Sequence, residues 1–136
     1  MRAVVQRVAE ASVRIEDRLH AGIQHGLLGL LGVEVGDTTE DLEWLCGKIA
    51  RIRLFPDADG VMNLDVNEAL GEVLLVSQFT LHASTRKGNR PSYIRAARPE
   101  EAIPLYLRAK QLLSELTQAR VKTGEFGAVM QVALIN

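Results

Sequence analysis

Apolar and polar residues alternate in the first part of the chain with the period of two that is typical of β-strands. Residues 3–8 and 11–15 are two such stretches, and a polar turn at residues 16–18 leads into a third at residues 19–23. Short alternating stretches at this spacing predict an antiparallel meander. Residues 26–33 are apolar on both faces, which predicts a central strand that is covered on both sides.

The apolar period then changes to that of a helix. Asp37 is followed three residues later by Glu40, which resembles a capping arrangement at a helix start. Apolar side chains recur at spacings of three and four, so residues 39–51 are predicted to form a helix. The repeating positions are Leu42, Leu45, Cys46, Ile49 and Ile52.

A second helix is predicted from Pro99, because proline suits the first turn and the following Glu100 and Glu101 suit the positive end of the helix dipole. A buried strand is predicted at residues 72–79, before this helix, and a return to strand is predicted from residue 121. Earlier in the chain, a turn at residues 57–60 separates two short strands. The apolar stripe of the second helix comprises Ile103, Tyr106, Leu112, Leu113 and Leu116.

The composition supports a single domain. Of the 136 residues, 47% are apolar, which is enough to close one core. We expect one α+β domain over residues 1–136, in which a mostly antiparallel or mixed sheet, or a barrel-like core, is packed by two main helices. Neither a run of about 18 apolar residues nor an export signal is present, so we expect a cytoplasmic protein without membrane contact. Cys46 is the one cysteine, and it suits a core position.

Common catalytic signatures are absent. There is no Gly-x-Ser-x-Gly elbow, phosphate-binding loop, dinucleotide fingerprint or His-Glu-x-x-His motif. The cysteine and three dispersed histidines form no metal-binding pattern, so we expect no metal and no cofactor. His82 follows Thr80 by two residues, and on an extended strand the two side chains would share a face, so the histidine could activate the hydroxyl. No orienting carboxylate is evident, which favours a solvated loop histidine.

Polar residues occupy the end of the predicted strand at 72–79, where Ser77, Gln78 and Thr80 follow an apolar run. One interpretation is that they satisfy backbone groups where the sheet ends. The other is that strand-end amides and hydroxyls converge on a pocket, in which hydrogen-bond donors stabilise an oxyanion during acyl transfer.

Residues 85–98 form a basic segment without an acidic residue, in a chain whose formal net charge is −1. Its basic side chains could simply be solvated. Their position directly after the polar strand end favours a second interpretation, in which Arg86, Lys87 and Arg90 bind the phosphates of a nucleic acid. A basic segment beside a pocket suggests a substrate that is linked to RNA.

Together these segments resemble the D-aminoacyl-tRNA deacylases, also called D-tyrosyl-tRNA deacylases. The resemblance implies a homodimeric α+β protein, with the active site near the subunit interface, that hydrolyses the ester between a D-amino acid and the 3′-terminal adenosine of tRNA. It also implies the removal of glycine from mischarged tRNA for alanine. The matching segments cover essentially the whole chain and are, in order, MRAVVQRV, GLLGLLGVEVGDT, KIARIRLFPDADGVMNLDV, VSQFTLHASTRKGNRPSY and TGEFGAVMQVALIN.

The first signature of the family, Ser-Gln-x-x-Leu, falls on residues 77–81. The resemblance implies two alternative mechanisms: attack by the hydroxyl of Thr80, or attack by water assisted by the 2′-hydroxyl of the substrate. We favour the second, with the oxyanion bound by backbone N–H groups near Phe79 and Thr80, because no base is evident for Thr80. The implied catalytic positions are Ser77, Gln78, Phe79 and Thr80.

The resemblance also implies that the segment around Met130 lines the substrate pocket, with Phe126 and Gly127, and we expect Arg7 to brace this pocket from beneath. Spacing alone would make Met130 a core methionine instead. Arg7 lies on an apolar strand, and a buried arginine requires a partner.

The second signature of the family, Asn-x-Gly-Pro-x-Thr, would begin at Asn136, the last residue of the sequence. In the family, its glycine and cis-proline enter the pocket of the partner subunit and exclude L-amino acids by main-chain contacts. We expect the natural chain to continue with this segment, and we expect a chain without it to discriminate less between D and L substrates.

Two other functions remain open. The chain could be a noncatalytic tRNA-binding module, in which Tyr93 stacks on bases beside the basic segment. It could also hydrolyse another small acyl ester that has an anionic leaving group.

Overall fold

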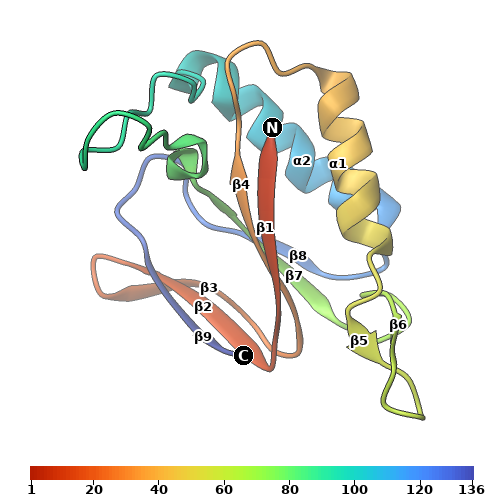
Figure 1. The fold of residues 1–136 in the computed structure, drawn as a ribbon. Coiled ribbons are helices and arrows are strands. Elements are labelled where there is room, and N and C mark those ends of the chain that lie inside the picture. The colour runs from red at the N-terminus through yellow and green to blue at the C-terminus, as the bar shows by residue number, and fades with distance from the viewer.

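The computed structural model describes residues 1–136 as one α+β domain, as the sequence predicts. Two helices cover one face of a mixed sheet, and a smaller antiparallel sheet lies against its other face (Figure 1). The sheets do not close into a barrel. The elements are β1 (Arg2–Val8), β2 (Glu10–Ile15), β3 (Arg18–Ile23), β4 (Gly26–Gly32), α1 (Thr39–Arg51), β5 (Phe55–Pro56), β6 (Met62–Leu64), β7 (Glu72–Ser77), the 3-10 helix η1 (Phe79–His82), α2 (Pro99–Leu116), β8 (Val121–Thr123) and β9 (Gln131–Ile135).

β4 is a central strand of the mixed sheet, whose order is β1-β4-β7-β8. It pairs antiparallel with β1 and parallel with β7, with Gly26 opposite Glu72 and Leu31 opposite Ser77. Six of its seven residues are buried, which confirms the prediction of a strand that is covered on both sides.

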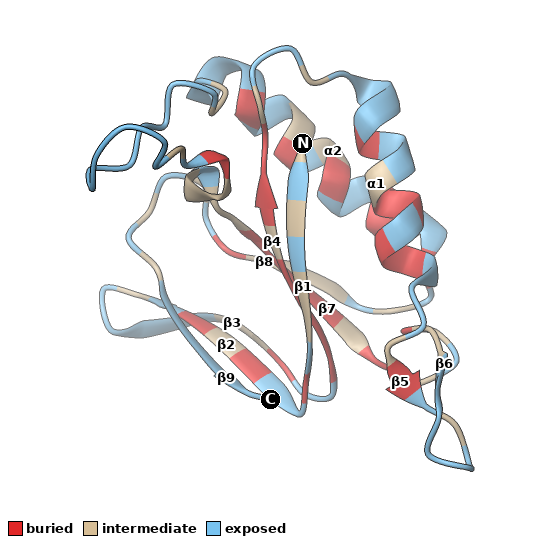
Figure 2. Ribbon diagram, viewed as in Figure 1, coloured by how far each residue is buried: buried red, intermediate tan, exposed pale blue.

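Alternate residues of β4 and β7 fill two separate cores, because successive side chains of a strand point to opposite faces of the sheet. Figure 2 shows the buried positions continuing along both strands and along the inner faces of the helices. The residues toward the helices are Leu27, Leu31, Val73 and Leu75, and those toward the smaller sheet are Leu28, Leu74 and Val76.

The meander predicted for the first three strands is wrong in one connection. β2 and β3 form the expected hairpin, with positive φ values of 49° at Glu16 and 60° at Asp17 in its turn. β1, however, pairs with β4, while β2 pairs with β9 on its other side. Only Ala9 separates β1 from β2, and a tight hairpin needs a loop of about two residues. The chain therefore crosses here from one sheet to the other.

Helix α1 has the predicted bounds, but its cap differs from the prediction. Thr38 is the N-cap and forms a capping box with Asp41. Asp37, which the sequence placed at the cap, instead accepts a hydrogen bond from the backbone N–H of Glu34 at 2.6 Å and one from the α-amino group of Met1 at 2.6 Å. A threonine hydroxyl reaches the free N–H groups of the first turn as well as a carboxylate does.

Cys46 lies on the buried face of α1 and is 1% exposed, which confirms its assignment to the core. Burial raises the pKa of its thiol to about 11. The thiol therefore stays protonated at neutral pH, and the reactive thiolate is scarce.

Helix α2 begins at Pro99, as predicted, and continues through Pro104. Its buried stripe is narrower than predicted, because Ile103 and Leu116 lie at the flanks and are 37% and 39% exposed. Neither helix is both long enough and apolar enough to cross a membrane. The residues that do face the interior are Ala102, Tyr106, Ala109, Leu112 and Leu113.

Candidate active site

The polar end of β7 leads directly into a pocket of about 300 Å³. β7 ends at Ser77, and the backbone N–H of Gln78 then donates to the carbonyl oxygen of Leu31 at 2.8 Å. The chain turns at once into η1. The pocket beside this turn is lined by Leu31, Val33, Val76, Ser77, Gln78, Phe79, Ala97, Ala102, Tyr106, Phe126, Gly127, Ala128, Met130 and Val132.

The lining is mostly apolar and includes no charged side chain. Phe79 lines the pocket and begins η1, followed by Thr80, and the first N–H groups of a helix have no acceptor within it. The side chain of Gln78, the residue before η1, does not cap them. Main-chain donors in such a position can bind an oxygen on which negative charge develops.

Thr80 lies on a 3-10 turn and not on an extended strand. Side chains on such a turn repeat every three residues, so Thr80 and His82 point in different directions, and the predicted shared face is wrong. Oγ1 of Thr80 accepts a hydrogen bond from Nε2 of Gln78. The hydroxyl is thus engaged with Gln78, while neither ring nitrogen of His82 has a hydrogen-bond partner.

His82 is buried, so the prediction of a solvated histidine is also wrong. The residue is 2% exposed, and Nδ1 lies 3.7 Å from a carboxylate oxygen of Glu34. Sequence reasoning did not identify this carboxylate, because Glu34 lies 48 positions earlier, after β4.

Tyr106 of α2 is a pocket residue that sequence reasoning assigned only to the core. Its hydroxyl donates to the carbonyl oxygen of Leu75 at 2.8 Å and lies 3.4 Å from that of Gly124. Burial raises the pKa of this hydroxyl to about 12, so it stays a donor at neutral pH. Its ring lies 5.8 Å from the ring of Phe126. A tyrosine in an apolar helical stripe was the only signal available from the sequence.

Most residues that were predicted for the site meet at this pocket, although two do not line it. Thr80 lies beside it and is joined to it through Gln78. Arg7 lies on β1 outside the lining, and its Nη1 donates to the carbonyl oxygen of Leu54 at 2.7 Å. The predicted residues that line the pocket are Ser77, Gln78, Phe79, Phe126, Gly127 and Met130.

The basic segment forms an exposed loop between η1 and α2 (Figure 2). Ser84 and Ser92 close this loop through backbone hydrogen bonds of 2.8 and 2.9 Å. Tyr93 packs edge to face on Phe79, with ring centroids 5.2 Å apart, and so joins the loop to the pocket. The predicted phosphate-binding residues Arg86, Lys87 and Arg90 are all exposed in the loop.

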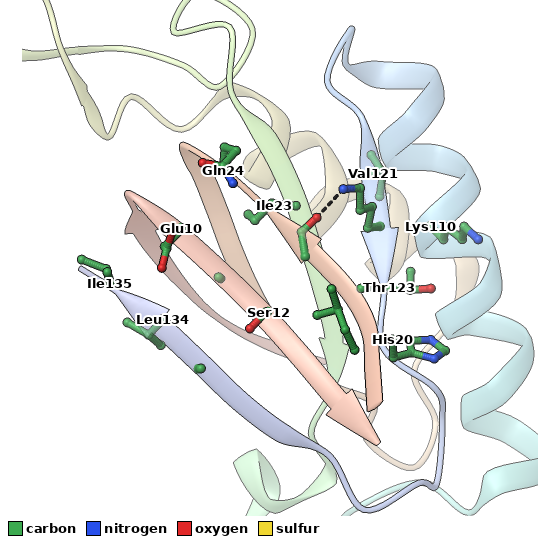
Figure 3. Close-up of a pocket in the computed structure, with 16 residues that line it drawn as sticks. Glu10, Ser12, His20, Ile23, Gln24, Lys110, Val121, Thr123, Leu134 and Ile135 are labelled. Carbon is green, nitrogen blue, oxygen red and sulfur yellow. Dashed lines mark hydrogen bonds between the residues drawn. The ribbon is translucent and has the colours of Figure 1, made fainter. Parts of the chain in front are cut away.

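A larger groove of about 870 Å³ lies away from these residues, between the smaller sheet, β8 and α2 (Figure 3). Its lining includes none of the predicted catalytic residues. The charge of Lys122 in this groove is already engaged, because Nζ donates to the carbonyl oxygen of Gly22 and lies 3.7 Å from Glu72. No group of three or more His, Cys, Asp or Glu side chains is arranged to hold a metal ion. The smaller pocket is therefore the candidate active site.

Comparison with known proteins identifies close relatives. A family model described as D-Tyr-tRNA(Tyr) deacylase matches residues 4–136. The chain is 60% identical over 136 residues to a D-aminoacyl-tRNA deacylase of Akkermansia muciniphila, and 54% identical to one of Bacteroides fragilis. Each alignment covers 100% of this chain and 91% of the relative.

Two solved structures also resemble this chain. The c-Myc DNA Unwinding Element Binding Protein has a TM-score of 0.95 and 38% identity, and the match covers 100% of this chain and 92% of that one. A probable eukaryotic D-amino acid tRNA deacylase has a TM-score of 0.82 over 97% of this chain and 91% of its own. The identity there is 14%, so the second match shows a shared fold alone.

Gly124 is predicted to set the position of Met130 in the pocket. A Cβ atom at Gly124 would lie 2.5 Å from Sδ of Met130, so Gly124→Ala should displace this flexible side chain. The free energy of unfolding should change by less than about 1 kcal/mol, while the methyl NMR resonance of Met130 should shift. Gly22→Ala is the matched control, because its Cβ would make only ordinary contacts, at 3.6 Å and beyond. An unmoved Met130 resonance in Gly124→Ala would contradict this role.

Proposed function

The chain belongs to the D-Tyr-tRNA(Tyr) deacylase family, and we propose that it hydrolyses its substrate by placing the ester against backbone donors, without a strong side-chain base. It is a D-aminoacyl-tRNA deacylase, a hydrolase that serves proofreading in translation. The mechanistic proposal rests on one observation. The pocket at the end of β7 lies beside the start of η1, which no side chain caps, and has no charged side chain in its lining.

In the proposed mechanism, the ester carbonyl lies against the backbone N–H groups of Phe79 and Thr80. Attack on the carbonyl carbon moves negative charge onto its oxygen, and donors that are already fixed in place stabilise that charge without reorganising. Ser77 and Gln78 fix the shape of this end of the pocket. The hydrogen bond from Gln78 to Thr80 supports this assignment, because it ties the turn to the strand end.

The proposed nucleophile is a water molecule that is assisted by the 2′-hydroxyl of the terminal ribose. The water oxygen bonds to the carbonyl carbon, the bond from that carbon to the 3′-oxygen breaks, and a proton of the water passes by way of the 2′-hydroxyl to the departing 3′-oxygen. An aminoacyl ester is already reactive, and the neighbouring hydroxyl is held close to the reacting carbonyl, so positioning supplies much of the acceleration. Thr80 is a poor alternative nucleophile, because its hydroxyl is paired with an amide that cannot act as a base.

Arg86, Lys87 and Arg90 are proposed to bind phosphates near the 3′ end of the tRNA. Their exposure supports this role, as does the contact between Tyr93 and Phe79 that attaches the loop to the pocket. Because aminoacyl-tRNA is used in translation, the proposed location of the enzyme is the cytoplasm.

A homodimer with the pocket near the subunit interface is proposed as the active form. β9 is an edge strand whose five residues are all exposed, and an unpaired apolar edge can pair with a second chain. Val132 of β9 also lines the pocket, so a partner at this edge would approach the site.

Rejection of L-amino acids is proposed to use main-chain contacts, supplied by a Gly-Pro segment of the partner subunit. The absence of a charged side chain from the lining supports this proposal, because no side chain there could hold the amino group of the substrate by its charge. Glycine has no side chain to be rejected, so glycyl-tRNA, including glycine on tRNA for alanine, is a proposed second substrate.

Removal of the terminal 2′-hydroxyl is predicted to slow deacylation about a hundredfold or more. Thr80→Ala should stay within about tenfold of the wild-type rate, because the hydroxyl orients Gln78 and does not attack. Single-turnover hydrolysis of D-aminoacyl-tRNA measures both effects, with Ser84→Ala as a control for deleting a hydroxyl outside the pocket. Full hydrolysis of the 2′-deoxy substrate, or near-abolition by Thr80→Ala in a folded protein that binds tRNA, would overturn the scheme.

Combined Arg86→Ala and Lys87→Ala substitutions are predicted to weaken tRNA binding and to reduce the slope of log Kd against log salt concentration by about two, because each phosphate contact releases about one counterion. The single-turnover rate at saturating enzyme should stay within about twofold. Substitution of Lys48 and Arg51 on α1 is the matched control for the loss of two positive charges. An unchanged salt slope would show that the loop does not contact phosphates.

Dilution is predicted to lower the sedimenting mass from twice that of one chain to that of one chain, and to lower the deacylation rate per chain in parallel. The reason is that the proposed site is incomplete without the partner. Circular dichroism at each concentration separates this loss from unfolding. Full activity per chain in a protein that sediments as a monomer would refute the dimer proposal.

A further inference from the structure

His82 closes η1, and its imidazole is buried without a hydrogen bond. The residue is 2% exposed, and neither Nδ1 nor Nε2 has a hydrogen-bond partner within the chain. Buried polar atoms in native proteins are almost always paired, because an unpaired one retains its full desolvation cost. A leucine of similar size would avoid this cost. The histidine is therefore unfavourable for stability alone, which points to a role in function.

The space for this imidazole comes from a glycine at the end of β4. A Cβ atom at Gly32 would lie 3.1 Å from Cδ2 and 3.2 Å from Nε2 of His82, and 2.8 Å from the carbonyl oxygen of Gln78. Gly32 thus lets both the imidazole and the start of the turn approach the backbone of β4. The ring is confined between this strand and the acidic residue that follows it.

That acidic residue is Glu34, whose Oε2 lies 3.7 Å from Nδ1 of His82. Other groups hold Glu34 in place: its carboxylate forms an ion pair with Arg95, and its backbone N–H donates to Asp37 at 2.6 Å. The α-amino group of Met1 lies 3.9 Å from Oε2 of Glu34. The carboxylate of Glu34 is therefore held in position near the imidazole of His82.

We propose that His82 is a positioning residue for deacylation, in which Nδ1–H is directed at the carboxylate of Glu34 and fixes the end of η1. This inference rests on the proposed function, because it assumes that the N–H groups of Phe79 and Thr80 bind the oxyanion. A 3-10 turn of four residues has weak internal hydrogen bonds, so its position depends on anchors outside it.

The other anchors of η1 show why an attachment at its end matters. Before the turn, the N–H of Gln78 donates to the carbonyl oxygen of Leu31 at 2.8 Å. Near the end, Nη1 of Arg2 donates to the carbonyl oxygen of Leu81 at 2.9 Å, but this arginine is exposed to solvent. His82 is the one buried side chain of η1. Its attachment to Glu34 therefore limits how far the N–H groups at the start of the turn can rotate.

His82 acts through position and not by transferring a proton to Thr80. The imidazole is packed between Gly32 and Glu34, whereas the hydroxyl of Thr80 is paired with Gln78. Loss of the attachment should consequently lower the rate of the chemical step and leave tRNA affinity unchanged.

Three substitutions at His82 test this inference. His82→Leu removes both ring nitrogens and should leave thermal stability equal or higher, while the single-turnover rate falls about tenfold to a hundredfold. His82→Asn places an amide nitrogen near the position of Nδ1 and should recover the rate to within about threefold of wild type. His82→Gln reaches toward the position of Nε2 and should remain as slow as the leucine variant. The Kd for tRNA should stay within about twofold in all three.

A double-mutant cycle with Glu34→Gln tests the partner. The glutamine should slow the wild-type protein but add little to the effect of His82→Leu, since the two side chains act as one unit. Four outcomes would each overturn the inference. The rate of His82→Leu could lie within about twofold of wild type, or the asparagine and glutamine variants could have equal rates. The effects in the cycle could be additive, or the loss of stability could parallel the loss of rate. The single-turnover rate of the wild-type protein is measured in parallel, with the normal substrate and with the 2′-deoxy substrate. Indifference of the wild-type rate to the 2′-hydroxyl would refute the proposed mechanism, whereas a fast His82→Leu variant beside a normal wild-type protein would refute this inference alone.

Discussion

The parallel pairing of β4 with β7 is the constraint on which both cores and the pocket depend. Strands that are buried on both faces must be apolar throughout, and these two supply side chains to the core beneath the helices and to the core beneath the smaller sheet. Gly26 lets the pairing begin, because any side chain there would collide with the backbone of Glu72. The contact of Gln78 with Leu31 extends the ladder past Ser77 and sets where η1 starts. A shift of one residue would turn every buried side chain to the wrong core.

Local signals in the sequence predict local structure well, whereas they fail where distant segments pair. The helix at residues 39–51 and the turn near Gly60, whose φ is +80°, depend on residues within one or two turns of each other. The partner of β1 is β4, and the partner of β2 beyond its hairpin is β9, more than a hundred residues away. Alternation shows that a segment is a strand, but it carries no information about which strand lies beside it.

The same distinction between local and distant residues applies to the candidate site. The run from Ser77 to Phe79 is contiguous, so a short motif could reveal it, and the resemblance extended the prediction to Phe126, Gly127 and Met130. The parts that were missed come from other elements: Tyr106 faces the pocket from α2, and Glu34 reaches His82 from the end of β4. The chemistry of a glutamate or tyrosine depends on what lies across from it, and only the folded chain decides that.

The proposed arrangement separates the groups that bind the tRNA from those that stabilise the reacting ester. The charged residues lie on an exposed loop, where water and salt weaken their attraction for phosphates, while the reacting ester would lie in an apolar pocket that no charged side chain lines. Main-chain donors are more effective in such a pocket, because a lower local dielectric strengthens each hydrogen bond. They are useful only if they stay in place, since a backbone group cannot adjust by changing rotamer as a side chain can. The hydrogen bond from Gln78 to Leu31 of β4 and the proposed contact of His82 with Glu34 meet that requirement.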